Sequence, residues 1–172
     1  MDEPLYAHHN SKHLHAHNPI IGMTNPHVEE AVTAIQDGYS CAQAVFSAYS
    51  KECGLDKETA RKITTGLGGG LGRSGNVCGA VTGAILVLGQ RYGMNSLEHA
   101  AAREETYALV KRLISEFTAI HGSINCAELL GYDMSDPVQF AEAKEKRVAS
   151  KICPCLVRDA TIILDKIIQE KD

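Results

Sequence analysis

The glycine-rich stretch of residues 66–84 constrains the fold more than any other part of the chain. It reads GLGGGLGRSGNVCGAVTGA, with five glycines in the seven residues 66–72. Glycine tolerates positive φ and close approach of backbones, so these residues predict an irregular, tightly packed loop. The apolar run behind it predicts a helix over about residues 77–91, buried on most sides and capped by Asn76. We expect Cys78 in the first turn of this helix, where backbone N–H groups and the helix dipole favour a thiolate.

Composition narrows the class of protein. The chain has 172 residues, 44% of them hydrophobic, and a formal net charge of −4, which is ordinary for one soluble domain. This charge suggests neither nucleic acid nor an anionic membrane as a partner. The longest apolar run is too short to cross a bilayer and no secretion signal is evident, so we expect a cytoplasmic protein without membrane insertion. In that compartment, six cysteines favour metal ligands or redox thiols over structural disulfides.

The histidines divide the chain into two parts. Residues 1–24 hold five of the eight histidines and show little apolar periodicity. We interpret them as a flexible His-rich extension without a catalytic role, either native or left from cloning. Residues 25–172 are expected to form a single domain.

Helix-capping patterns run through the rest of the chain. Asn25 followed by a proline, then Ser40 and Asp56, are each expected to cap a helix. The longest helix is predicted over about residues 97–120, and Cys153 with the proline after it is expected to open a terminal helix. No stretch alternates with a period of two. The fold class is therefore all-α, a bundle of about six to eight helices around the buried central helix.

Four cysteines fall at equivalent places in this helix map. Cys41, Cys78, Cys126 and Cys153 all lie in or just before a predicted first turn, whereas Cys53 lies at a helix end. A helix N-terminus lowers the pKa of a thiol and stabilises a metal-bound thiolate or an anionic cluster. This placement predicts a shared redox or metal site. Packing of the cysteines as small apolar residues is the alternative.

Glycines and two further cysteines complete the candidate site. Backbone N–H groups near cluster sulfurs tune a cluster's reduction potential. We expect this support from four glycines: Gly68, Gly69, Gly70 and Gly79. Cys155 is an alternate metal ligand, a resolving thiol or part of the core, and Cys53 is expected in the core. The motif G-x-G-x-x-G at residues 70–75 does not predict dinucleotide binding, because a helix precedes it instead of a strand.

Four segments carry a resemblance to a known family. They read GYSCAQAV (residues 38–45), CGAVTG (78–83), INCAELLG (124–131) and CPCLVRDA (153–160). From about residue 28 to its end, the chain resembles the C-GCAxxG-C-C family of redox-active proteins, whose members are often encoded near transporters. The resemblance implies that the four family cysteines are Cys41, Cys78, Cys126 and Cys153. A similar domain is joined to the haem-binding part of split-Soret cytochromes, where an iron–sulfur cluster is reported. This chain lacks haem motifs, so haem exchange is not implied.

Three functions follow from these residues, and the sequence leaves open whether the protein is an enzyme. The first is electron transfer or redox sensing by an iron–sulfur cluster bound through the four cysteines. The second is thiol–disulfide exchange, with Cys78 as the attacking thiol and a neighbouring cysteine resolving. The third is zinc or copper binding for storage or delivery. We also expect a redox partner protein of unknown identity and a homodimer, since an exposed cluster usually has a partner surface.

Overall fold

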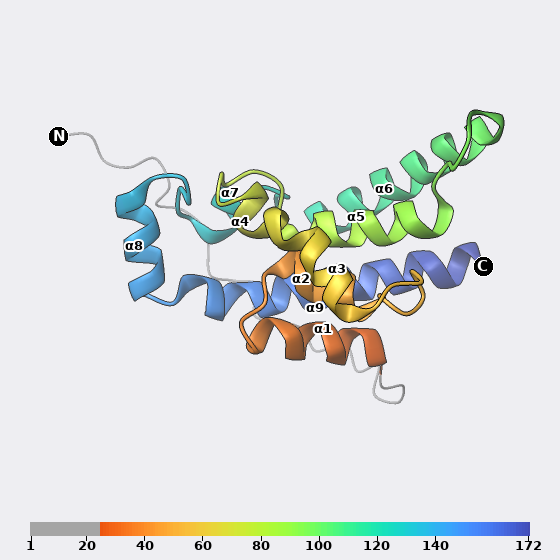
Figure 1. Cartoon of the computed structure of the whole chain (residues 1–172). Helices are drawn as coiled ribbons and strands as arrows, with labels where there is room; N and C mark the ends of the chain where they lie inside the picture. The colour runs from red at the N-terminus through yellow and green to blue at the C-terminus, as the bar shows by residue number, and fades with distance from the viewer. Residues whose placement is uncertain (1–24) are drawn as a thin grey trace.

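The computed structural model describes residues 25–172, and this part of the chain is all-α (Figure 1). The predicted His-rich extension, residues 1–24, lies outside the described residues. Between residues 25 and 172 there is no β-sheet, only an isolated antiparallel bridge between Val77 and Asn125. The all-α prediction is confirmed. In order, the elements are α1 (Pro26–Gln36), α2 (Cys41–Ala48), α3 (Lys57–Thr64), η1 (Thr65–Leu67), α4 (Gly68–Leu71), α5 (Gly79–Tyr92), η2 (Leu97–His99), α6 (Ala100–His121), α7 (Cys126–Leu130), α8 (Pro137–Glu145) and α9 (Val148–Lys171).

The first three helices begin at the predicted caps. The Asn25 side chain accepts hydrogen bonds from the first backbone N–H groups of α1, and Asp56 accepts one from α3. Ser40 and Gln43 form a capping box at the start of α2, in which each side chain bonds the other residue's backbone N–H. Gln43 also donates to the carbonyl of Arg61 at 3.1 Å. The start of α2 is therefore fixed both locally and against α3.

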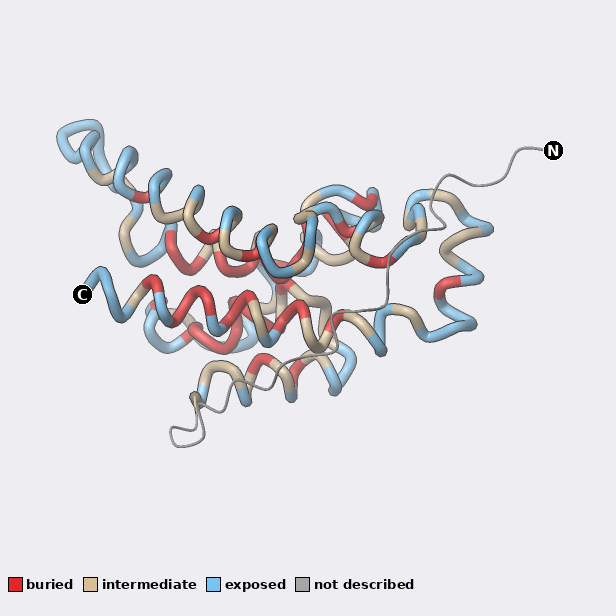
Figure 2. Tube along the Cα trace, turned by 180° about the vertical axis from the view of Figure 1, so that it is seen from behind, coloured by how far each residue is buried: buried red, intermediate tan, exposed pale blue. Residues whose placement is uncertain are grey.

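Three helices supply most of the core: α2, α5 and α9. Six of the eight residues of α2 are buried, and α5 and α9 each present a buried face along their length. Figure 2 shows that buried positions gather where these helices meet, while the outer faces of α6 and α8 are exposed. Burying an aliphatic side chain such as Leu88 or Leu164, both 0% exposed, contributes roughly 1.5–3 kcal/mol.

The glycine loop, residues 66–75, contains an unusual left-handed turn. Five consecutive residues from Gly69 to Arg73 have positive φ, among them Leu71 at 66° and Arg73 at 67°. Left-handed conformations cost a residue with a side chain roughly 1–2 kcal/mol. The element labelled α4 is thus part of this loop and not a right-handed helix. Without it, the described residues contain eight α-helices, which agrees with the predicted six to eight.

The predicted start of the central helix was wrong by two residues. The helix α5 begins at Gly79, and Cys78, not Asn76, is its N-cap. Residues 75–78 instead pair through their backbone with residues 124–127, so Asn76 uses its carbonyl to accept the N–H of Cys126. Because this pairing uses their backbone groups, residues 75–78 cannot also form a helical turn.

The predicted start of the terminal helix was also wrong. The helix α9 begins at Val148 and continues through Pro154, which makes it the longest helix, at 24 residues against 22 for α6. Proline in a helix interior lacks the N–H that would bond the carbonyl four residues earlier, here that of Ser150. Val148 and Ile152 pack against the buried cluster of Cys126, Leu130 and Cys153, and this packing stabilises the additional turn. Cys153 therefore lies inside a helix.

A polar network joins α1, α2 and α9 on the other side of the core. Tyr49 donates to Asp165 at 2.6 Å, and Asn25 also donates to this carboxylate. The ring of His27 stacks on Tyr49 and contacts Asp165 at 3.1 Å and Glu52 at 3.0 Å. Burial, followed by the charge of Asp165, raises the pKa of Tyr49. This hydroxyl consequently stays protonated as a donor.

Among residues 25–172, no helix is both long enough and apolar enough to cross a bilayer.

Candidate functional site

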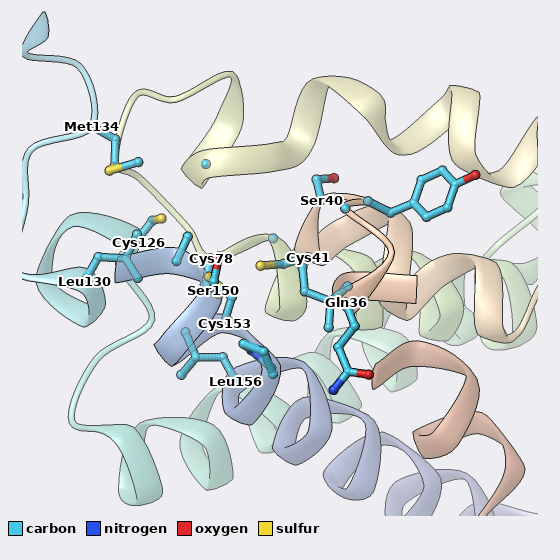
Figure 3. A pocket seen from close by; sticks show the side chains of 17 residues that line it. Gln36, Ser40, Cys41, Cys78, Cys126, Leu130, Met134, Ser150, Cys153 and Leu156 are labelled. Carbon is cyan, nitrogen blue, oxygen red and sulfur yellow. The ribbon is translucent and has the colours of Figure 1, made fainter. Parts of the chain in front are cut away.

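A cavity of about 430 Å³ opens where the glycine loop meets α1, α2, α7 and α9, and four cysteines line it (Figure 3). Cys41 is the first residue of α2, Cys78 is the N-cap of α5 and Cys126 is the first residue of α7. Cys153 reaches the same cavity from the interior of α9. All six cysteines of the chain are free thiols. The four cysteines thus converge, although only three of them do so from helix starts.

Paired backbone segments hold Cys78 beside Cys126. The N–H of Cys78 donates to the carbonyl of Ile124 at 2.7 Å, and the N–H of Cys126 donates to the carbonyl of Asn76 at 2.6 Å. One residue further along, the N–H of Ala127 bonds the carbonyl of Gly75 at 3.0 Å. These reciprocal bonds fix the two cysteines relative to each other without any side-chain contact.

Glycines bring the remaining backbone close to the cysteines. A Cβ added at Gly79 would lie 2.9 Å from the Ala42 nitrogen and 3.1 Å from the Cβ of Cys41. One added at Gly70 would lie 2.6 Å from backbone atoms of Asn76 and 2.7 Å from the Cβ of Cys126. Real Cβ atoms do not approach backbone so closely, which explains why these positions need glycine.

The other two glycines predicted to support the site also lie near it. Gly69 lines the cavity directly. A Cβ added at Gly68 would lie 2.9 Å from the Cβ of Ser40, the residue before Cys41. The loop therefore packs against the starts of both α2 and α7.

Cys41 and Cys153 shift each other's pKa in opposite directions. Interaction with the Cys153 side chain raises the pKa of Cys41 well above its usual range, and burial adds to this effect. Interaction with Cys41 lowers the pKa of Cys153, against the opposing effect of burial. Cys153 therefore gives up its proton more readily than Cys41. Figure 3 shows the Cys41 side chain directed toward Cys78 and Cys153.

Burial dominates at the other two cysteines. It raises the pKa of Cys78 to about 11, although the N–H groups of Ala80 and Val81 partly oppose the shift. Burial, with the neighbouring cysteines, raises the pKa of Cys126 to about 12. The predicted thiolate at Cys78 is therefore not favoured by the protein alone. A bound cation would have to supply the charge that stabilises thiolates here.

The spacing of the sulfurs bears on which metal species could bind. A single zinc or copper ion requires its thiolate ligands at about 2.3 Å from one point. In the part of the chain that the structure describes, no group of three or more His, Cys, Asp or Glu side chains is arranged to hold a metal ion.

Cys155, the alternate ligand in the sequence analysis, does not line the cavity. Its thiol donates to Asp159 at 3.5 Å and accepts from Arg158 at 3.4 Å. Asp159 in turn contacts His121 of α6 at 3.1 Å. Residues two positions apart in a helix point to nearly opposite faces, so the side chain of Cys155 does not point in the same direction as that of Cys153. Cys53 is 6% exposed in the main core, as predicted.

The cavity wall includes residues that the sequence analysis did not single out. Met134 places a thioether at the edge of the cavity opposite Cys41, beside Leu130 (Figure 3). Gln36 and Tyr39 also line the cavity. Met134 lies in a turn and Gln36 at a helix end, with no motif or periodicity, so no sequence pattern indicates them, whereas Tyr39 lies within the segment GYSCAQAV, residues 38–45.

Comparisons with known proteins give one match. Residues 39–167 match the model of the family described as "putative redox-active protein (C_GCAxxG_C_C)". No curated protein and no solved structure matches the chain. The matched region contains all four cysteines of the cavity and the whole glycine loop.

Proposed function

The chain belongs to the C_GCAxxG_C_C family of redox-active proteins, and from this premise we propose that it binds an iron–sulfur cluster for electron transfer or redox sensing. The observation that carries the proposal is the convergence of Cys41, Cys78, Cys126 and Cys153 on one cavity. Iron–sulfur clusters are held by four cysteine thiolates, which is the number and type of donors present. Free cysteines persist in a reducing compartment, so a cytoplasmic location is part of the proposal.

The chemistry of the cavity fits such a group. Among the described residues no histidine or carboxylate lines it, so its donors are soft sulfur atoms, which select iron–sulfur clusters, zinc or copper(I). Its volume of about 430 Å³ falls in the range of roughly 300–1,000 Å³ found for small-ligand sites. A cluster spans several atoms and does not require its four thiolates to meet at one ion. Zinc has no redox chemistry, so the family's redox description favours a cluster over zinc.

The rest of the chain would hold and shield the group. A bound cluster would supply one-electron transfer at a potential set by its charge, its hydrogen bonds and its exposure. The N–H groups of Ala80 and Val81 act on the sulfur of Cys78, and donors to sulfur favour the more negative, reduced state. Leu130 and Leu156 on the cavity wall limit access of water. The left-handed loop brings the Gly69 backbone to the cavity.

Thiol–disulfide exchange is a second candidate because Cys41 and Cys153 line one cavity and shift each other's pKa. Their two thiols would lose two electrons and two protons to a substrate disulfide, forming one Cys41–Cys153 disulfide and two substrate thiols. The attacking thiol would be Cys153, whose pKa is lowered, and not Cys78, whose pKa burial raises to about 11. The nucleophile is the thiolate, so Cys78 is poorly suited to this role.

Anaerobic purification tests the cluster directly. We expect the protein, as isolated or after reconstitution with Fe²⁺ and sulfide, to contain iron and acid-labile sulfide in equal amounts. Visible absorption that bleaches with dithionite and a matching paramagnetic resonance signal should accompany them. A colourless protein without iron after reconstitution would refute the cluster. Stoichiometric zinc would then indicate the metal-binding alternative, and a Cys41–Cys153 disulfide would indicate the exchange alternative.

A further inference from the structure

A second cavity of about 160 Å³ adjoins the four-cysteine cavity. This smaller cavity lies under α8, and Phe140 and Ala143 of that helix form part of its wall. Figure 3 shows two members of the shared wall, Leu130 and Met134, on the side of the four-cysteine cavity away from Cys41. Four residues line both cavities: Leu130, Met134, Ala149 and Ser150.

The charges along these walls have one sign. The protein carries 21 acidic against 17 basic residues, yet among residues 25–172 no carboxylate lines either cavity. The charged residues of that range that do are Lys144 and Arg147, both exposed residues that line the smaller cavity. Among residues 25–172, neither has a carboxylate within ion-pair distance, whereas the neighbouring Lys146 pairs with Glu142. A third cation, Arg73 of the glycine loop, lies 4.7 Å from the ring of Phe140.

Arg147 also holds a strained backbone. Its φ of 52° and ψ of 40° are left-handed, at the position just before α9 begins. Glycine adopts this conformation freely, whereas a residue with a side chain is strained there by roughly 1–2 kcal/mol. Strain of this kind gathers at functional sites, where the side chain has a role of its own. An arginine is suited to such a role because its planar guanidinium binds oxyanions with paired hydrogen bonds.

We propose that the smaller cavity binds the anionic head of a small organic acid, whose apolar body extends toward the four cysteines. Lys144 and Arg147 would contact the carboxylate, and Leu130, Met134 and Phe140 would contact the body. The smaller cavity has the volume of about five water molecules, enough for a short carbon chain. The inference rests on the proposed function in one respect, since it makes this acid the ligand or substrate of the redox site.

A matched pair of probes tests the anion site. Hexanoate and 1-hexanol share an apolar chain and differ in charge, and their binding to the full chain can be followed by NMR chemical shifts of the protein. We expect hexanoate to bind about tenfold more tightly or better, since hydrogen bonds to charged groups are the stronger ones. Bound hexanoate should also slow the alkylation of Cys41 by iodoacetamide, because the two cavities adjoin.

One substitution removes the charge without disturbing the fold. Arg147→Gly deletes the guanidinium and relieves the strained φ, so the variant should be at least as stable as the wild type. We expect its preference for hexanoate over 1-hexanol to fall at least threefold, with Lys144 supplying what remains. Lys111→Ala, which removes an exposed cation from α6 outside both cavities, should leave the tenfold preference intact.

Three results would overturn the inference: equal affinity for the two probes in the wild type, an undiminished preference in Arg147→Gly, or no binding of hexanoate at millimolar concentration. These outcomes are independent of metal content. A protein that prefers hexanoate but never holds iron would keep the anion site and refute the cluster. A protein that holds iron and ignores hexanoate would do the reverse.

Discussion

The contact between α5 and α2 gives the sharpest prediction about stability, through a pair of glycines in one helix. A Cβ added at Gly79 would lie 2.9 Å from the backbone nitrogen of Ala42, 3.1 Å from the Cβ of Cys41 and 3.3 Å from the carbonyl oxygen of Leu67. None of these atoms is the end of a flexible side chain. Gly89, ten residues later in the same helix, is exposed and would place a Cβ in open space.

The two substitutions to alanine should therefore have opposite signs. Alanine is favoured over glycine inside a helix by up to about 1 kcal/mol, so Gly89→Ala should stabilise the protein by about 0.5–1 kcal/mol. At Gly79 overpacking costs about 1–3 kcal/mol, and the gain in helix propensity is small at the first helical residue. The net expectation for Gly79→Ala is a loss of about 1–2 kcal/mol.

Thermal and urea unfolding of both variants measure this difference. For a protein of this size, 1 kcal/mol shifts Tm by about 2–4 °C. We expect Tm to fall by about 2–8 °C for Gly79→Ala and to rise by about 1–4 °C for Gly89→Ala. The iron content after reconstitution should fall only in the first variant, because the added methyl displaces Cys41. Equal shifts for the two variants would refute the argument that Gly79 is present for close packing.

Three further predictions concern single side chains. Tyr49→Phe should cost about 1–3 kcal/mol, because the buried Asp165 loses a donor. The folded-state pKa of Tyr49 is raised, so its contribution to the free energy of unfolding is complete below a pH of about 10 and is lost above it, by up to about 1.4 kcal/mol per pH unit. Urea unfolding at pH 9 and pH 11 should therefore show a smaller loss of stability between the two pH values in the variant than in the wild type. Ser40→Ala should cost about 1 kcal/mol in urea unfolding by removing the cap of α2, and no change would contradict the capping box. Pro154→Ala should raise Tm by restoring a donor to the Ser150 carbonyl, whereas a lower Tm would show that the proline is favourable in α9.

Local patterns predicted much of the fold. The caps at Asn25, Ser40 and Asp56 each satisfy backbone N–H groups with a side chain a few residues away, and such bonds are readable from adjacent residues. The irregular packing of the glycine loop was likewise predicted from composition. The length of a left-handed run that includes Leu71 and Arg73 was not, because neither residue favours that conformation by itself.

Errors arose where contacts distant in sequence override local patterns. Asn76 is a good N-cap by type, but its backbone pairs with residues 124–127, which nothing nearby in the sequence indicates. Pro154 is typical of a first helical turn, yet packing of Val148 and Ile152 extends α9 upstream of it. The prediction that every cysteine of the site lies at a helix start was wrong at Cys153 for this reason.

The polar wall of the site was not predictable either. Lys144 and Arg147 belong to an ordinary run of charged residues, and only the fold places them at a cavity that carries no carboxylate. Met134 lies in a turn and likewise reaches the site through tertiary structure alone.

Replacing each cysteine in turn with serine tests the central claim, that four of the six form one redox site. Iron and acid-labile sulfide per chain would be measured after identical anaerobic reconstitution, with circular dichroism to confirm that each variant is folded. We predict a large loss of iron and sulfide for serine at Cys41, Cys78, Cys126 or Cys153, and wild-type content for Cys53→Ser and Cys155→Ser. Wild-type iron in the folded variants of the four, or an equal loss in the two controls, would contradict the account.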